Sequence, residues 1–207
     1  EGPRTAGSTH FLEHLLFKGT NKRSALDIAV AFDSVGGESN AETAREHTAY
    51  WARVRDADLD MAIETLTDMV TDSRLDEEDF SMERGVILDE LAMGEDSPTD
   101  TVHDTFQMAV HGDRPIGRPV GGTPQAIREV ERADVWEHYQ AHYGPSSLIV
   151  AAAGNVDHDS VCERVQAALE GSPWDAGSAA SPWPRRSTTV TPIADRDKDI
   201  TRRRDVT

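Results

Sequence analysis

Most of this chain carries its apolar residues at the spacing of an α-helix, and this pattern constrains the fold more than any other feature. The clearest case is residues 56–72, where Leu59, Ile63, Leu66 and Val70 fall on one side of a predicted helix. The same reasoning predicts helices over residues 8–18, 24–35, 73–93, 99–111, 124–130, 134–142 and 157–170. Many helices with few strands between them favour an α+β fold over alternating βαβ units.

Two regions have the composition of β-strands. The segment ESNAETAREHTAYWARV at 38–54 is rich in Thr, Tyr, Trp and Val in its second half, and it predicts two short strands joined by a turn. The run SSLIVAAAG at 146–154 is continuously apolar and predicts a buried strand. We therefore expect a mostly antiparallel sheet packed with several helices.

Composition also suggests how the chain is divided into domains. Its 207 residues suit one domain of ordinary size with a piece of another. The Gly/Ser/Pro-rich stretch at 171–187 is typical of a linker, so we expect one domain over 1–170 and the truncated start of a second over 188–207. The opening EGPRTAGSTH has neither an initiator methionine nor a signal peptide. We expect a cytoplasmic protein whose natural start is missing here.

The balance of charge excludes several classes of partner. A net charge of −17 argues against nucleic acid or an anionic membrane as a partner, and no segment has the roughly 18 consecutive apolar residues of a membrane helix. The bases are 18 arginines and only three lysines, while 22 of the acids are aspartates. This surface suggests a halophilic protein, which should unfold in dilute buffer and fold in concentrated KCl. The alternative is a mesophile whose GC-rich genome favours arginine over lysine.

The pentapeptide HFLEH near the start of the chain predicts a metal site. On a helix, each residue advances by about 100°, so His14 lies about 40° from His10 and Glu13 lies about 60° from His10 on the other side. Two imidazoles on one face can bind one zinc ion, and the glutamate between them can reach a water on that ion. The single cysteine, Cys162, excludes a disulfide and a cysteine-based zinc site within the chain.

A catalytic zinc needs a third protein ligand, and the helix EEDFSMERGVILDELAM offers two candidates. Glu83 and Glu90 are seven residues apart, so they project from the same face of that helix beside its apolar stripe. A carboxylate at the edge of a buried stripe needs a partner, which a zinc ion would supply. His138 and His142 form a rival pair four residues apart, but without a carboxylate between them we expect ordinary helix-end histidines.

Several motifs together resemble one family of peptidases. The stretches HFLEHLLFKGT, GGESNAETAREHTAY, ERGVILDELAM, PIGRPVGGT and HYGPSSLIVAAAGNVD resemble, in this order, the inverted zinc peptidases (inverzincins) of the M16 family. The resemblance extends over residues 1–170. It also fits in spacing, because 75 residues separate His14 from Glu90, as the family pattern requires of its third ligand.

The resemblance implies a role for each matching residue. His10, His14 and Glu90 would bind Zn²⁺, and Glu13 would act as the general base. Glu83 would support a ligand through a hydrogen bond. Asn40 and Ala41 would lie on the edge strand along which the family aligns an extended peptide substrate.

The implied function is that of a zinc-dependent endopeptidase acting on peptides or unfolded segments. We expect the chain to lack the family's opening strands and nearly all of a following domain. We therefore expect it to need a missing C-terminal half or a sister subunit, and to be poorly active alone. The alternative is a non-catalytic partner subunit of such an assembly. The complete set of His10, Glu13, His14 and Glu90 favours the peptidase, because non-catalytic members usually lack part of it.

Overall fold

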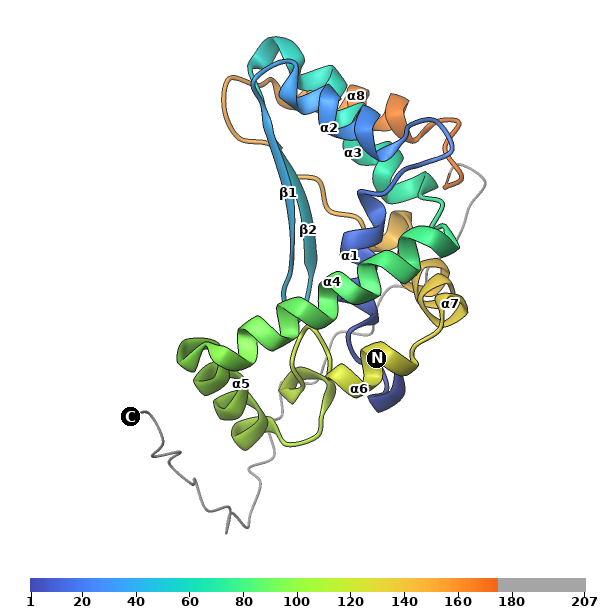
Figure 1. Cartoon of the computed structure of the whole chain (residues 1–207). Helices are drawn as coiled ribbons and strands as arrows, with labels where there is room; N and C mark the ends of the chain where they lie inside the picture. The colour runs from blue at the N-terminus through green and yellow to red at the C-terminus, as the bar shows by residue number, and fades with distance from the viewer. Residues whose placement is uncertain (175–207) are drawn as a thin grey trace.

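The computed structural model describes residues 1–174 and is mostly helical, with one small antiparallel sheet (Figure 1). This confirms the α+β class, and the helices lie at or within a few residues of their predicted bounds. The helices are α1 (Ser8–Leu16), α2 (Ala25–Asp33), α3 (Leu59–Asp72), α4 (Glu77–Asp96), α5 (Pro98–His111), α6 (Pro124–Glu129), α7 (Arg132–His142) and α8 (His158–Leu169). The strands are β1 (Glu38–Thr43) and β2 (Thr48–Arg53).

Helix α1 is the centre of the main hydrophobic core. It contacts α4, α7 and β1, and in Figure 1 it passes behind the long helix α4. Its apolar side chains are fully buried: Phe11, Leu12, Leu15 and Leu16. Phe11 stacks on Phe80 of α4 with ring centroids 4.4 Å apart. This contact sets the point along their axes at which α1 and α4 pack together. It thereby brings the polar face of α1 next to the polar face of α4.

We expect Phe11→Ala to lower the free energy of unfolding by about 3–5 kcal/mol, because it leaves a cavity beneath Phe80 and removes their stacking. Urea unfolding followed by circular dichroism measures the change. Leu26→Ala is the matched control, because Leu26 lies on α2 with 71% of its surface exposed. A loss for Phe11→Ala no larger than for the control would contradict the central position of α1.

The two strands form an isolated hairpin that runs along the molecule. Their register pairs Glu38 with Arg53 at one end and Thr43 with Thr48 at the other. In Figure 1 the hairpin extends from the end of the molecule that carries α2, α3 and α8 toward α5. Near its turn, Arg45 donates to the Ile116 carbonyl at 3.1 Å and to Asp104 of α5 at 2.8 Å. These bonds hold the turn of the hairpin in place.

The predicted buried strand at 146–154 is wrong for the fold as described. Residues 148–153 are not in a strand, and Ile149 and Val150 are 90% and 49% exposed. An apolar segment becomes a strand only when a neighbouring strand pairs with its backbone, and the one sheet among residues 1–174 contains β1 and β2 alone. The apolar composition of the segment therefore predicted neither its secondary structure nor its burial.

Helix α3 also buries a different face from the predicted one. The stripe of Leu59, Ile63, Leu66 and Val70 is half-buried. The buried positions of α3 are Ala62, Thr65, Asp68, Met69 and Thr71. The reason is that α3 lies between α2 and α8 and contacts both, so its apolar surface is divided between two neighbours.

The second half of the chain is only partly described. The predicted linker at 171–187 is described for its first four residues, and the predicted second-domain segment 188–207 lies outside the described residues. Within residues 1–174, no helix is long and apolar enough to cross a lipid bilayer.

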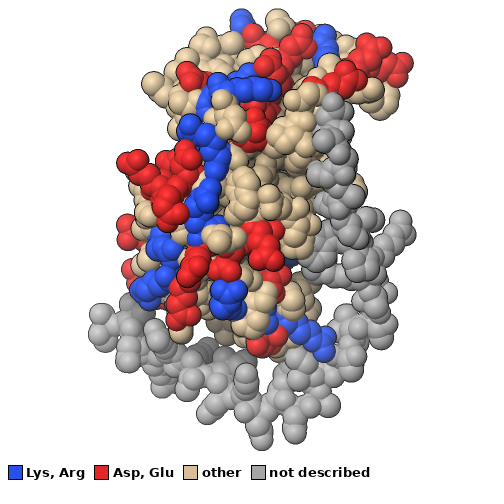
Figure 2. Space-filling model, turned by 90° about the vertical axis from the view of Figure 1, so that its right-hand side faces the viewer, with Lys and Arg blue, Asp and Glu red and all other residues tan. Residues whose placement is uncertain are grey.

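The charged residues are mixed on the surface rather than separated. On the face that Figure 2 shows, Lys and Arg side chains form a band with Asp and Glu side chains on both sides. Ion pairs such as Arg23–Glu64 and Arg118–Asp113, at 2.6 and 2.7 Å, link the two kinds of residue. Such pairs neutralise part of the excess acid on the surface.

Candidate metal centre

Three side chains from two helices converge on one point. The Nε2 atoms of His10 and His14 on α1 lie 3.3 Å apart. The Glu90 Oε2 atom, from α4, is 3.7 Å from His10 Nε2 and 3.4 Å from His14 Nε2. The helical spacing places both imidazoles on one face of α1, as predicted, and the packing of α4 on α1 brings Glu90 to them.

The triangle has the dimensions of a zinc site. With ligand bonds near 2.0–2.1 Å, tetrahedral zinc separates its ligand atoms by about 3.3 Å, close to the three distances here. Two histidines and one glutamate also make up a known set of catalytic zinc ligands that keeps a fourth position open. The Glu90 side chain is 45% exposed, which leaves one side of the triangle accessible. These residues therefore fit a catalytic zinc ion.

Glu83 orients His14. It lies on the same face of α4 as Glu90 but is buried. Its Oε2 atom is 2.9 Å from His14 Nδ1. Its other oxygen is 2.6 Å from Lys18 Nζ, which compensates the buried charge. A hydrogen bond from Nδ1–H to a carboxylate keeps the proton on that nitrogen and leaves Nε2 free to bind a metal. Glu83 thus lies beside His14 and not among the converging atoms.

The surroundings of His10 favour its neutral form. Burial, followed by the neighbouring His14, lowers the pKa of His10 below its ordinary value. The loop at 119–122 covers this end of α1 closely. A Cβ on Gly122, whose φ is +78°, would lie 2.3 Å from the Ala6 carbonyl oxygen. Glycine is therefore required at Gly122, which explains part of the PIGRPVGGT motif in physical terms.

Glu13 points from α1 toward the sheet. Its carboxylate accepts a hydrogen bond from the hydroxyl of Thr43, the last residue of β1. It also interacts electrostatically with His10. Nothing in the sequence indicated Thr43 as a neighbour of the site, because its contact with Glu13 depends on how β1 packs against α1. For Lys18 one signal was available, because it is one of three lysines and follows His14 by four residues.

The two residues predicted to bind substrate lie further along β1. Asn40 is exposed and Ala41 is half-buried. The Ala41 N–H donates to the Asn40 Oδ1 atom at 2.8 Å. Both residues lie on the same strand as Thr43, with Ala41 two positions and Asn40 three positions before it.

The rival histidine pair lacks a third ligand. The rings of His138 and His142 on α7 lie 4.5 Å apart, and His138 Nε2 is 3.0 Å from the Thr9 hydroxyl. Among residues 1–174, three His, Cys, Asp or Glu side chains converge as a possible metal site at His10, His14 and Glu90 alone. The structure therefore gives this pair no metal-binding geometry.

His138 instead predicts acid sensitivity. Burial, and then the charge of His142, lowers the pKa of His138 to about 4. Because an unfolded histidine takes up its proton near pH 6.5, stability is full above that pH and is lost as the pH falls from 6.5 toward 4. We expect His138 to account for a loss of about 3 kcal/mol between pH 7 and pH 4. Urea unfolding at pH 7 and pH 4 measures it. His138→Gln should reduce the difference in the free energy of unfolding between the two pH values, whereas His103→Gln, at an exposed position, should not. An equal pH dependence in both variants would contradict the role of His138.

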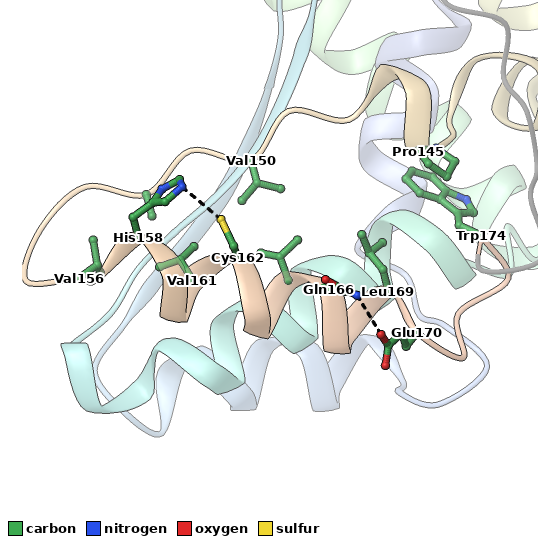
Figure 3. Close-up of a pocket in the computed structure, with 12 residues that line it drawn as sticks. Pro145, Val150, Val156, His158, Val161, Cys162, Gln166, Leu169, Glu170 and Trp174 are labelled. Carbon is green, nitrogen blue, oxygen red and sulfur yellow. Dashed lines mark hydrogen bonds between the residues drawn. The ribbon is translucent and has the colours of Figure 1, made fainter.

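A hollow on the described surface lies away from the candidate metal centre. It has a volume of about 680 Å³ and is lined by α8, the extended segment around Val150, and Trp174 (Figure 3). Its lining is mainly apolar. Cys162 faces it, with Sγ 3.5 Å from His158 Nε2. None of the residues that converge at the metal centre lines this hollow.

Comparison with known families identifies the class to which this fold and site belong. The model for the insulinase family, peptidase family M16, matches residues 1–124, which is more than half of the chain. The model for the M16 peptidase inactive domain matches residues 129–205. The chain therefore belongs to the M16 peptidase family. The two models meet between residues 124 and 129; the boundary that composition places at 171–187 stays a prediction.

Individual relatives agree with this assignment. The chain is 53% identical to an uncharacterised zinc protease of Streptomyces coelicolor, over 88% of this chain and 40% of that protein. It is 46% identical to one of Mycobacterium leprae, over 91% and 42% of the two chains. A crystal structure of a protease from Helicobacter pylori superposes with a TM-score of 0.77 at 27% identity, over 83% and 43%. The chain thus spans about 40% of the length of these curated relatives.

Proposed function

We propose that this chain provides the metal centre of a zinc-dependent endopeptidase. The observation that carries the proposal is the convergence of His10, His14 and Glu90 within the ligand spacing of zinc, with Glu13 on the same helix face. Membership of a peptidase family and the name "zinc protease" of its relatives support it. Glu83 supports the same proposal, because a buried carboxylate behind a metal-binding histidine is a recurrent feature of zinc sites.

Each residue has a separate task in this mechanism. His10, His14 and Glu90 would hold the ion, and Glu83 would keep the His14 ring in place. A zinc ion held there would activate a water molecule and polarise the carbonyl of the scissile bond. Glu13 would take a proton from the attacking water and pass it to the departing amine. The partly exposed side of Glu90 leaves access for the peptide.

We propose that the substrate is a peptide or an unfolded segment bound in an extended conformation along β1. A free strand edge can pair with an added chain through backbone hydrogen bonds. The hydrogen bond from Ala41 N–H to the exposed Asn40 side chain is one that a substrate carbonyl could replace. Because Thr43 ends the same strand and contacts Glu13, a peptide on this edge would lead toward the general base.

The active assembly would contain more than the 174 residues described here. The match to a second M16 domain model and the 40% coverage of relatives both support a C-terminal half or a sister subunit as partner. The alternative is a non-catalytic partner subunit, which the description of that second model as inactive favours. Retention of all four residues at the centre favours catalysis.

Hydrolysis of internally quenched peptides by the full-length protein tests the proposal. We expect cleavage that stops when 1,10-phenanthroline removes the metal and returns when zinc is added. Magnesium added in place of zinc is the control and should not restore it. A protein that binds zinc at this centre but cleaves no peptide would support the non-catalytic alternative.

A further inference from the structure

The general base of the proposed mechanism is held by a residue from the neighbouring strand. The Thr43 hydroxyl donates to the Glu13 Oε2 atom, although the two residues are 30 positions apart and belong to different elements. Both side chains are half-buried, so water competes less for the bond than it would at an open surface. A hydrogen bond to a carboxylate is also stronger than one between neutral groups.

The position of Thr43 is itself well determined. Thr43 is the last residue of β1 and pairs with Thr48 across the hairpin. The turn that follows is tied to the rest of the molecule through Arg45, whose guanidinium bonds Ile116 and Asp104. Strand β1 contacts α1 directly. A threonine side chain is also stiff about χ1 because it is branched at Cβ. The hydroxyl therefore reaches Glu13 from a fixed point.

We propose that Thr43 is a positioning residue for Glu13, an inference that rests on the proposed peptidase function. A glutamate carboxylate, carried on three rotatable bonds, spends only part of its time aimed at a reacting water when nothing holds it. With Oε2 held by Thr43, the Oε1 atom is the one left to accept the proton. Fixing a reacting group in this way raises the rate of the chemical step and has little effect on how tightly substrate binds.

The same bond connects substrate alignment to proton transfer. Thr43 lies two residues after Ala41 on β1, so their side chains are on the same side of the strand. A peptide that pairs with the edge of β1 would steady the strand that holds Glu13. The strand would then both align the substrate and orient the base.

The test uses three variants of the full-length protein. Thr43→Val has nearly the same shape but lacks the hydroxyl, and we expect kcat to fall about tenfold with KM and zinc content unchanged. Thr43→Ser restores the hydroxyl and should keep kcat within about threefold of the wild type. Thr105→Val makes the same change at an exposed position of α5, away from Glu13, and should leave kcat unchanged. A crystal structure of Thr43→Val should show the Glu13 carboxylate turned away from its wild-type orientation.

A double-variant cycle separates positioning from a general structural effect. If Thr43 acts through Glu13, then Thr43→Val should cause no further loss in a Glu13→Gln background. Full additivity, an unchanged kcat in Thr43→Val, or an equal loss in Thr43→Ser would each overturn the inference. These results are distinct from failure of the proposed function, in which the wild type shows no zinc-dependent cleavage or Glu13→Gln cleaves as well as the wild type.

Discussion

Replacing Glu13 by glutamine is expected to lower kcat for peptide hydrolysis by about 10²–10⁴-fold while zinc stays bound, because the change removes a general base and no metal ligand. Glutamine has nearly the same size as glutamate and can still accept the Thr43 hydrogen bond through its amide oxygen. It cannot take a proton from water at neutral pH. The protein should therefore keep its fold and its metal but lose the chemical step.

Peptide cleavage and zinc content, measured on the same preparation of full-length protein, test this expectation. Glu95→Gln is the matched control, because Glu95 is exposed near the end of α4 and lies outside the converging cluster. Loss of zinc in Glu13→Gln would mean that Glu13 helps to hold the ion. Full activity with zinc bound would mean that another group acts as the base.

Removal of a metal ligand should have the second-largest effect. We expect Glu90→Ala to weaken zinc binding more than about a hundredfold, because only two of the three converging atoms remain. Glu83→Gln should weaken it less, by about 10–100-fold, because Glu83 bonds His14 Nδ1 and does not approach the metal position. The order of the two variants therefore separates a ligand from its support.

Competition with a fluorescent zinc chelator measures these affinities. Asp89→Asn is the matched control on α4, because Asp89 is the exposed neighbour of Glu90 and does not belong to the cluster. A Glu83→Gln variant weaker in zinc binding than Glu90→Ala would reverse the two assignments. Equal binding by Glu90→Ala and the wild type would remove Glu90 from the site.

Helical periodicity predicted much of what positions the candidate site. Phe11, Leu12, Leu15 and Leu16 occupy one side of α1, and their burial leaves His10 and His14 together on another side. The seven-residue spacing also placed Glu83 and Glu90 correctly on one face of α4. It could not assign their environments. Tertiary packing makes Glu83 buried and Glu90 partly exposed, so the choice of Glu90 as ligand came from the family resemblance.

Contacts between distant elements were beyond prediction for a different reason. The bond from Thr43 to Glu13 and the pairing of Lys18 with Glu83 depend on where the hairpin and α4 lie against α1. The apolar run around Ile149 was misjudged because apolar composition shows that a segment avoids water, but not which element covers it. The spacing of apolar residues therefore predicted the helices, whereas tertiary packing determines which of their side chains come into contact.

The most direct test of the central claim is anomalous diffraction at the zinc absorption edge from crystals of the full-length protein grown with zinc. We predict a single strong peak bonded to His10 Nε2, His14 Nε2 and the Glu90 carboxylate, with Glu13 beside it and not bound. No peak between these three residues, or a peak at His138 and His142 in its place, would contradict the assignment of the metal centre.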